Sequence, residues 1–146
     1  MHYVLGIFRE EKLYVEASAA DPTWSGPWFN LGLLMRKQKR LEEAKHAVDM
    51  SIVLKESSAA YYVLQAQIVR DMGKDSDMKE SLDIAWKLYP KLSDQNEWEL
   101  GWYITASEMR EDKASADAAQ QERSRRKAGV VPSRHEGPGL LPALVA

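Results

Sequence analysis

Side chains of similar size recur every 34 positions along the first 90 residues of the chain. Two sets show the spacing: the small residues Ala17, Ser51 and Ala85, and the large apolar residues Tyr14, Val48 and Leu82. Pro22 and Pro90 lie two such steps apart, 68 residues. A fixed period of about 20 to 50 residues is typical of proteins that stack one small structural unit several times. The sequence therefore predicts a short array of repeated units.

The repeated unit is predicted to consist of two helices. Between residues 41 and 52, apolar or small side chains at positions 41, 44, 48, 51 and 52 follow the three-and-four spacing of one helical face, and residues 78–89 behave alike. Short polar breaks at residues 37–40 and 73–76 suit tight turns between antiparallel helices. No strand or hairpin signal is present. The predicted fold class is all-α, built from antiparallel helix-turn-helix repeats.

Small residues within these units mark the points where two helices come closest. Packed helix axes lie about 8 to 10 Å apart, and the closest approach needs the smallest side chains. Gly32 and Ala66 are the predicted contact points. The large residues predicted to fill the space around them are Trp28, Leu31, Val48, Tyr62 and Leu82.

These residues resemble the tetratricopeptide repeat (TPR) family, whose 34-residue unit reads W-x2-L-G-x2-Y, then A-x3-F, then P. The first full unit reads Trp28-x2-Leu31-Gly32-x2-Met35, then Ala44-x3-Val48, with Glu56 at the proline position. The second unit has Tyr62, Ala66, Val69, Leu82, Ala85 and Pro90 at the motif positions, and departs from the motif at Gln65 and Met78. The resemblance implies a short right-handed α-solenoid.

The resemblance also divides the chain into five segments. Residues 1–24 form a partial repeat or N-terminal helix, 25–58 the first unit and 59–92 the second. Residues 93–128 form a degenerate third unit or capping helices, in which Leu100-Gly101 restores part of the motif before a polar last helix. Residues 129–146 contain Pro132, Pro138 and Pro142 and are expected to be a flexible tail.

Composition excludes several classes of function. The chain has no cysteine, so disulfide scaffolds and thiolate metal sites are excluded. Twenty basic and 22 acidic residues give a net charge of −2, which offers no broad basic field for specific nucleic-acid binding. No stretch approaches the roughly 18 consecutive apolar residues of a membrane span. Residues 1–8 are apolar but make a poor signal peptide, so a cytoplasmic location is expected.

Catalytic and metal-binding patterns are absent from the sequence. His2, His46 and His135 are scattered, and no known catalytic or phosphate-binding motif occurs. The acidic pairs at 42–43 and 75–77 lie where helices are expected to start. Negative charge at a helix start interacts favourably with the helix dipole and stabilises the helix. The basic run at residues 123–127 suits the end of a helix for the same reason. We therefore expect a protein that is not an enzyme and needs no cofactor or metal.

Function is implied by the resemblance alone. In the TPR family the first helices of successive units line a concave face that binds a peptide or an amphipathic helix of another protein. The positions that match this face are Phe29, Leu33 and Arg36 in the first unit, Val63, Gln67 and Arg70 in the second, and Trp98 and Trp102 in the third. Aromatic and Arg side chains are enriched at binding hot spots. An apolar strip edged by Arg36 and Arg70 is the predicted partner site.

One TPR subtype, which clamps the C-terminal tails of chaperones, can be tested residue by residue. Asn30, which is also counted among the predicted partner-binding residues, matches one clamp position. Phe29, Leu33, Ala60 and Leu64, however, stand where the family places Lys, Asn or Arg. An apolar or amphipathic ligand is therefore favoured. Two alternatives stay open: self-assembly, in which residues 3–22 stack on a second copy, and an accessory interaction region of a larger protein.

Overall fold

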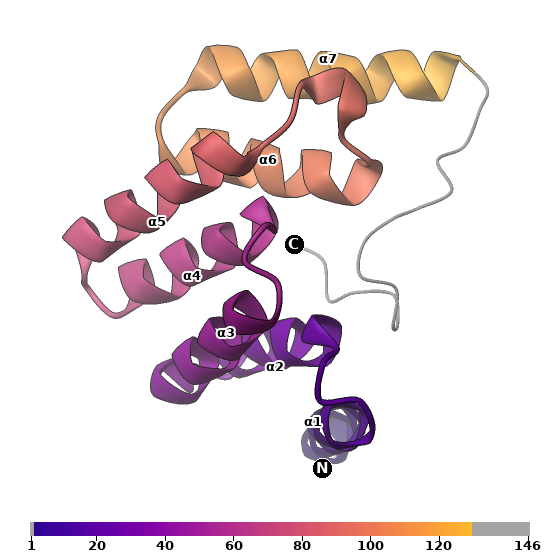
Figure 1. Ribbon diagram of the computed structural model, residues 1–146, viewed down its shortest axis with the longest axis vertical. Coiled ribbons are helices and arrows are strands. Elements are labelled where there is room, and N and C mark those ends of the chain that lie inside the picture. The colour runs from indigo at the N-terminus through magenta and orange to yellow at the C-terminus, as the bar shows by residue number, and fades with distance from the viewer. Residues whose placement is uncertain (1, 130–146) are drawn as a thin grey trace.

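The computed structural model describes residues 2–129, with side chains described from Arg9 onward. Within this range the chain forms seven α-helices and one 3-10 helix, with no β-strand (Figure 1). The elements are α1 (His2–Ala20), α2 (Ser25–Lys37), α3 (Leu41–Leu54), α4 (Ala59–Asp71), α5 (Asp75–Leu88), η1 (Leu92–Asp94), α6 (Glu97–Met109) and α7 (Lys113–Ala128). Helices that follow one another pack antiparallel in the pairs α2–α3, α4–α5 and α6–α7, and α1 packs against α2. The predicted all-α class and sequential helix pairs are confirmed.

The expected flexible tail, residues 129–146, lies outside the described residues except for Gly129. Among residues 2–129, every helix is too short or too polar to cross a lipid bilayer.

The turn inside each helix pair has one repeated geometry. Lys39, Gly73 and Glu111 all adopt a left-handed backbone conformation, with φ of 63°, 81° and 59°. The amide that follows each of them donates to a carbonyl five residues earlier: Arg40 to Met35 at 2.9 Å, Lys74 to Val69 at 2.9 Å, and Asp112 to Ser107 at 2.8 Å. This is the bond that closes a Schellman motif and satisfies the last helical carbonyls. The first two turns lie 34 residues apart, so the polar breaks predicted from the sequence are confirmed as turns.

Close backbone packing occurs where the sequence places its small residues. A Cβ atom added to Gly32 would lie 3.5 Å from the Ala44 carbonyl oxygen and 3.6 Å from the Val48 nitrogen. The backbones of α2 and α3 therefore touch at Gly32, as predicted, and Ala66 is fully buried on α4.

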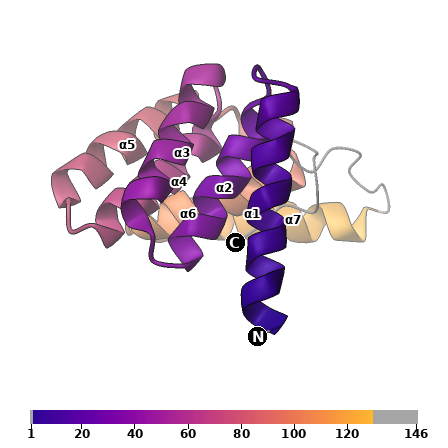
Figure 2. The ribbon, with the colours of Figure 1, turned by 90° about the horizontal axis from the view of Figure 1, so that it is seen from below.

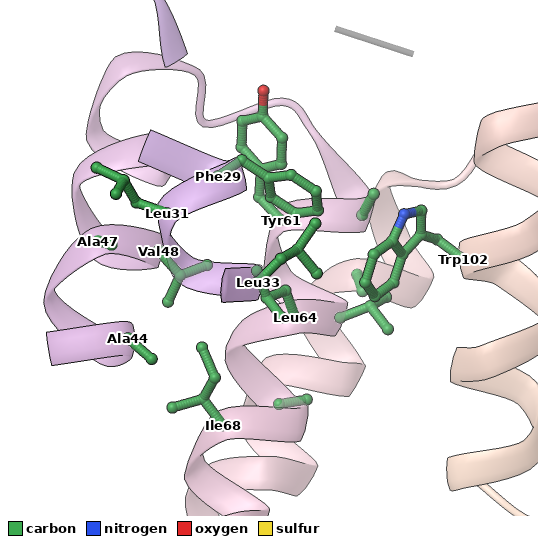
Figure 3. Packing of buried hydrophobic residues seen from close by; sticks show 14 of the residues in the cluster. Phe29, Leu31, Leu33, Ala44, Ala47, Val48, Tyr61, Leu64, Ile68 and Trp102 are labelled. Carbon is green, nitrogen blue, oxygen red and sulfur yellow. The ribbon is translucent and has the colours of Figure 1, made fainter. Parts of the chain in front are cut away.

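The large residues expected around these crossings divide into two groups. Leu31, Val48 and Leu82 are buried, which confirms the prediction for them. Trp28 and Tyr62 are only half-buried at the edge of the core, because the positions between the helices are filled by their neighbours Phe29 and Tyr61. Figure 3 shows Phe29, Tyr61 and Trp102 converging with leucines from α2 and α4.

The first helix is attached to the helix pairs by one buried ring and one arginine. Tyr14 is buried against the core. Arg40, at the start of α3, donates from Nη1 to Glu11 Oε2 at 2.9 Å and from Nη2 to Glu11 Oε1 at 3.1 Å. Such a paired arrangement fixes orientation as well as distance. Figure 2 shows α1 running alongside α2, with its first turns extending past the rest of the helices.

Candidate functional site

Helices α2, α4 and α6 together form the face that the sequence analysis assigns to a partner. Phe29 of α2 is the centre of an aromatic cluster. Its ring centroid lies 4.8 Å from that of Tyr61 on α4 in a stacked arrangement, and 5.6 Å from Trp98 and 5.5 Å from Trp102 on α6 in edge-to-face arrangements. Both geometries are favoured for aromatic pairs. We call these four residues the aromatic cluster.

The structure places the apolar members of the predicted strip inside the core. The exposed fraction is 8% or less for each of them: Phe29, Leu33, Val63, Trp98 and Trp102. The two tryptophan rings of α6 reach Phe29 of α2, and Figure 3 shows Trp102 beside the side chains of α2 and α4. The solvent-facing apolar strip expected from the sequence is therefore closed over by its own aromatic side chains. The assignment of these residues to a partner stays a prediction.

The polar members of the predicted site lie around the same face. Asn30 and Gln67 are buried, at 1% and 7% exposure. Arg36 donates from Nε to Asp71 Oδ2 at 2.7 Å, and from Nη1 to Gln67 Oε1 at 3.4 Å. Arg70 is exposed, with its Nε 4.0 Å from Asp71 Oδ1. The two arginines thus share one carboxylate at the ends of α2 and α4, which leaves this rim with a net positive charge.

Three buried polar atoms of predicted site residues have no hydrogen-bond partner among the described residues. They are Asn30 Oδ1, Trp98 Nε1 and Trp102 Nε1. Most buried polar side-chain atoms in proteins are paired, and each unpaired one costs about 1 to 3 kcal/mol. One unpaired acceptor on α2 and two unpaired donors on α6 leave hydrogen-bonding capacity unused inside the core.

A cavity of about 360 Å³ opens beside the aromatic cluster. Its walls come from the α3–α4 connection, the end of α5 and the start of α6. We call it the α4–α6 cavity, and its lining includes Lys55, Ser57, Ser58, Tyr61, Leu88, Pro90, Asn96, Trp98 and Glu99. Of this set, the sequence analysis predicts only Trp98 as a partner-binding residue. The others occupy three separate junctions, and no single helical period connects them.

The two helix starts at this cavity differ in how their backbone amides are satisfied. At α6, Asn96 and Glu99 form a capping box, with Glu99 N donating to Asn96 Oδ1 at 2.8 Å and Asn96 N donating to Glu99 Oε1 at 3.0 Å. At α4, Ser58 occupies the cap position without a side-chain cap hydrogen bond, and the first turn has no acidic residue. The start of α6 is therefore capped by side chains, whereas at the start of α4 the Tyr61 amide donates to the Ser58 carbonyl oxygen at 3.2 Å.

The titratable groups of the cavity do not form a catalytic arrangement. The Tyr61 hydroxyl lies 2.8 Å from Ser25 Oγ. Burial raises the pKa of Tyr61, opposed by that hydrogen bond, so the phenol stays neutral at physiological pH. Lys55 and Glu99 give one charge of each sign. Within residues 2–129 no group of three metal-ligating side chains lies together. The cavity is suited to hydrogen bonding and apolar contact.

The last turn of α7 packs beside η1 and the start of α6. Arg126 donates from Nη2 to the Leu92 carbonyl oxygen at 3.0 Å, and its Nη1 lies 3.6 Å from Glu97 Oε1. Arg123 pairs with the same glutamate at 3.5 Å. Glu97 directly precedes Trp98. The basic run of residues 123–127 is thus used in part to dock α7 beside the start of α6.

Comparison with known proteins identifies no relative of this chain. No model of a known protein family matches the chain, and no curated protein matches it. The TPR resemblance rests on the motif residues, and the helix pairs and their repeated turns are compatible with it.

Proposed function

We propose that this protein is a non-enzymatic interaction scaffold, a short right-handed α-solenoid of the TPR type that binds a peptide or helix of another protein. The observation that carries the proposal is the face of α2, α4 and α6, where the α4–α6 cavity opens beside the aromatic cluster and the exposed Arg70 lies on the rim. Aromatic side chains at such a face are the type most often found at binding hot spots.

The accessible part of the proposed site is its rim and its cavity. Arg36 and Arg70 mark one end, and the α4–α6 cavity lies toward the starts of α4 and α6. Because the aromatic rings between them are buried, we expect them to hold the shape of the face, while a partner contacts Arg70 and the cavity lining. The arginines favour a partner with an acidic residue at one end of its contact segment.

Charge reversal on the rim tests this proposal. Arg70→Glu reverses the charge of an exposed side chain on the proposed face. Lys79→Glu reverses the charge of an exposed side chain on α5, away from that face. Both variants should fold like the parent chain, which circular dichroism checks. In affinity capture followed by mass spectrometry, we expect proteins that bind the parent chain and the Lys79→Glu chain to be lost from the Arg70→Glu chain. The same captured set for both variants would count against the proposed face.

A second candidate function, self-assembly, is favoured by the first helix. The first turns of α1 extend past the other helices (Figure 2), and Leu13 and Val15 are 45% and 49% exposed. Pairing of α1 with a second copy would cover such side chains. Light scattering at two protein concentrations separates the candidates: a mass that rises with concentration, and falls back in Leu13→Glu, supports self-assembly, whereas a strict monomer contradicts it.

A further inference from the structure

We propose that the outward side of α7 binds a second copy of the chain, with the two α7 helices antiparallel about a two-fold axis at Gln121. The inference goes beyond the proposed function, because α7 lies outside the face of α2, α4 and α6 that is assigned to another protein. Three properties of α7 support it: the exposure of this side, the order of its charges and the small size of its other side chains.

One side of α7 packs on the protein and the other side faces solvent. The inward side contains Ala116 and Ala119, both buried, and Arg123, which pairs with Glu97 on α6. Gln121 lies roughly 160° around the helix from Ala119, so it points outward. Five exposed residues lie within about 40° of that direction, and we call them the α7 outer face: Ala114, Asp117, Gln121, Arg125 and Ala128.

The α7 outer face lies at one end of the series of helix pairs. Figure 1 shows α7 as the last helix of the described chain. Its main packing partners there are α6 and η1, both on the inward side. A second molecule can therefore approach the outer face along the length of the helix.

The charges of the outer face are self-complementary in an antiparallel pair. Asp117 and Arg125 lie four residues before and four residues after Gln121. When a second α7 runs in the opposite direction with the two Gln121 residues side by side, each Asp117 lies level with Arg125 of the second copy. The two Asp117 residues are then roughly 12 Å apart along the axis, beyond the screening length at physiological salt. A parallel pair would instead bring like charges level, which selects the antiparallel arrangement.

Both charges are available for such a contact. The Arg125 side chain is 72% exposed, and within its own chain it pairs with Glu122 one turn earlier. An exposed pair of this kind contributes little to stability, so Arg125 can exchange it for a carboxylate of the second copy at small cost. The ion pairs that α7 forms within residues 2–129 involve Glu122, Arg123, Arg125 and Arg126, and they leave Asp117 out.

The uncharged residues of the outer face also match themselves. The antiparallel register sets Ala114 level with Ala128 of the second copy, and small side chains let two helix axes approach to about 8 Å. The Gln121 amide at the two-fold axis can both donate to and accept from its copy. Every position thus meets a suitable residue of the same helix, as a two-fold contact requires. A contact along one 16-residue helix is small, so we expect a weak, reversible dimer.

Single cysteines test the arrangement in the full-length chain, which has no cysteine of its own. Gln121→Cys places the two thiols at the two-fold axis, and mild oxidation should give a disulfide-linked dimer. Ala114→Cys is the matched control, because its two copies would lie roughly 21 Å apart and a disulfide needs Cα atoms within about 7 Å. A mixture of Ala114→Cys and Ala128→Cys chains should again give a linked dimer.

A charge exchange tests the ion pairs without any cross-link. Sedimentation velocity at increasing concentration should show association of the parent chain. Asp117→Arg and Arg125→Asp each bring like charges level and should weaken association roughly tenfold or more. The double variant with both substitutions restores opposite charges and should recover it. Circular dichroism checks that α7 stays helical in all three variants.

Three results would overturn the inference. They are a parent chain that stays monomeric at every concentration, equal cross-linking of Gln121→Cys and Ala114→Cys, and a double variant that associates as weakly as the single variants. Leu13→Glu on α1 should leave the Gln121→Cys cross-link unchanged, and its loss would place the contact on α1 instead. Arg70→Glu should also leave it unchanged, so a failure of partner capture counts against the proposed function alone.

Discussion

The first and third helix pairs contain the same dipeptide, Leu-Gly, and use it differently. In α2, Gly32 lies against the backbone of α3, whereas in α6 a Cβ atom added to Gly101 would have no neighbour within 4 Å. The leucines differ as well. Leu31 belongs to the main core, and Leu100 belongs to a separate small cluster with Ile104 and Ala119. The dipeptide therefore marks a close helix crossing in α2 but not in α6.

The second helices of the two pairs explain this difference. In α3 the face toward α2 includes Ala44, Ala47 and Val48, all buried, and α7 buries only Ala116 and Ala119. The α7 helix is attached by Arg123 and Arg126, which pair with Glu97 on α6. Apolar burial contributes more to stability than surface ion pairs do, because water and salt screen exposed charges. We expect α7 to be the easier of the two helices to detach.

Truncation of the two leucines should give the largest effect and the clearest contrast. Leu31→Ala leaves a cavity in the main core, and we expect it to lower the free energy of unfolding by about 2 to 5 kcal/mol. Leu100→Ala should lower it less, toward about 2 kcal/mol, because its small cluster can collapse. Urea denaturation followed by circular dichroism measures both. A larger loss for Leu100→Ala would reverse the comparison.

Valine substitutions at the two glycines test the crossing itself. Gly32→Val forces side-chain atoms toward the Ala44 carbonyl and should destabilise the protein by about 1 to 3 kcal/mol. Gly101→Val meets open space, and its effect should stay within about 0.5 kcal/mol. Thermal unfolding of the two variants provides the measurement. Equal destabilisation would show that α6 also packs closely at its glycine.

The left-handed turn residues should respond to glycine in a graded way. Lys39 and Glu111 adopt a conformation that glycine adopts without a steric penalty, so Lys39→Gly and Glu111→Gly should each stabilise the protein by up to about 1 kcal/mol. Gly73→Ala should destabilise it by a similar amount, about 1 kcal/mol, because it introduces that penalty. Melting temperatures decide the matter: a fall for both glycine variants would contradict the turn geometry.

Acid should loosen α7 before the other helices. A hydrogen bond from the Ser115 hydroxyl lowers the pKa of Asp112, and the Arg125 side chain lowers the pKa of Glu122. A carboxyl with a lowered folded pKa contributes stability above its unfolded pKa of about 4, and this contribution is lost as the pH falls through the folded value. Both carboxyls lie at the surface and are only partly buried, so solvent screens them and the effect should be small.

Amide hydrogen exchange at pH 5 and pH 3 measures this effect helix by helix. We expect protection of α7 to decrease toward pH 3 relative to α3, after correction for intrinsic exchange rates. In Asp112→Asn the decrease should be smaller, because one of the two carboxyls is gone. Equal changes in α3 and α7 would contradict a local cause.

Periodicity in the sequence predicts the helices, the turns and the close contact at Gly32, because each of these depends on residues near one another in the chain. Whether the predicted partner face is open to solvent or covered depends on the distance between α6 and α2. That distance is set by the connection through Pro90 and η1, which has no counterpart in the earlier unit. Trp98 and Trp102 could therefore be assigned to a face from their spacing, but their contact with Phe29 could not.

The sequential packing of the helices also affects how quickly the chain can fold. Each helix makes most of its contacts with the helix before or after it. Proteins dominated by such local contacts have little loop-closure entropy to overcome, and they fold in microseconds to milliseconds. A stopped-flow refolding experiment on this chain should accordingly find most of the helical signal regained within the dead time.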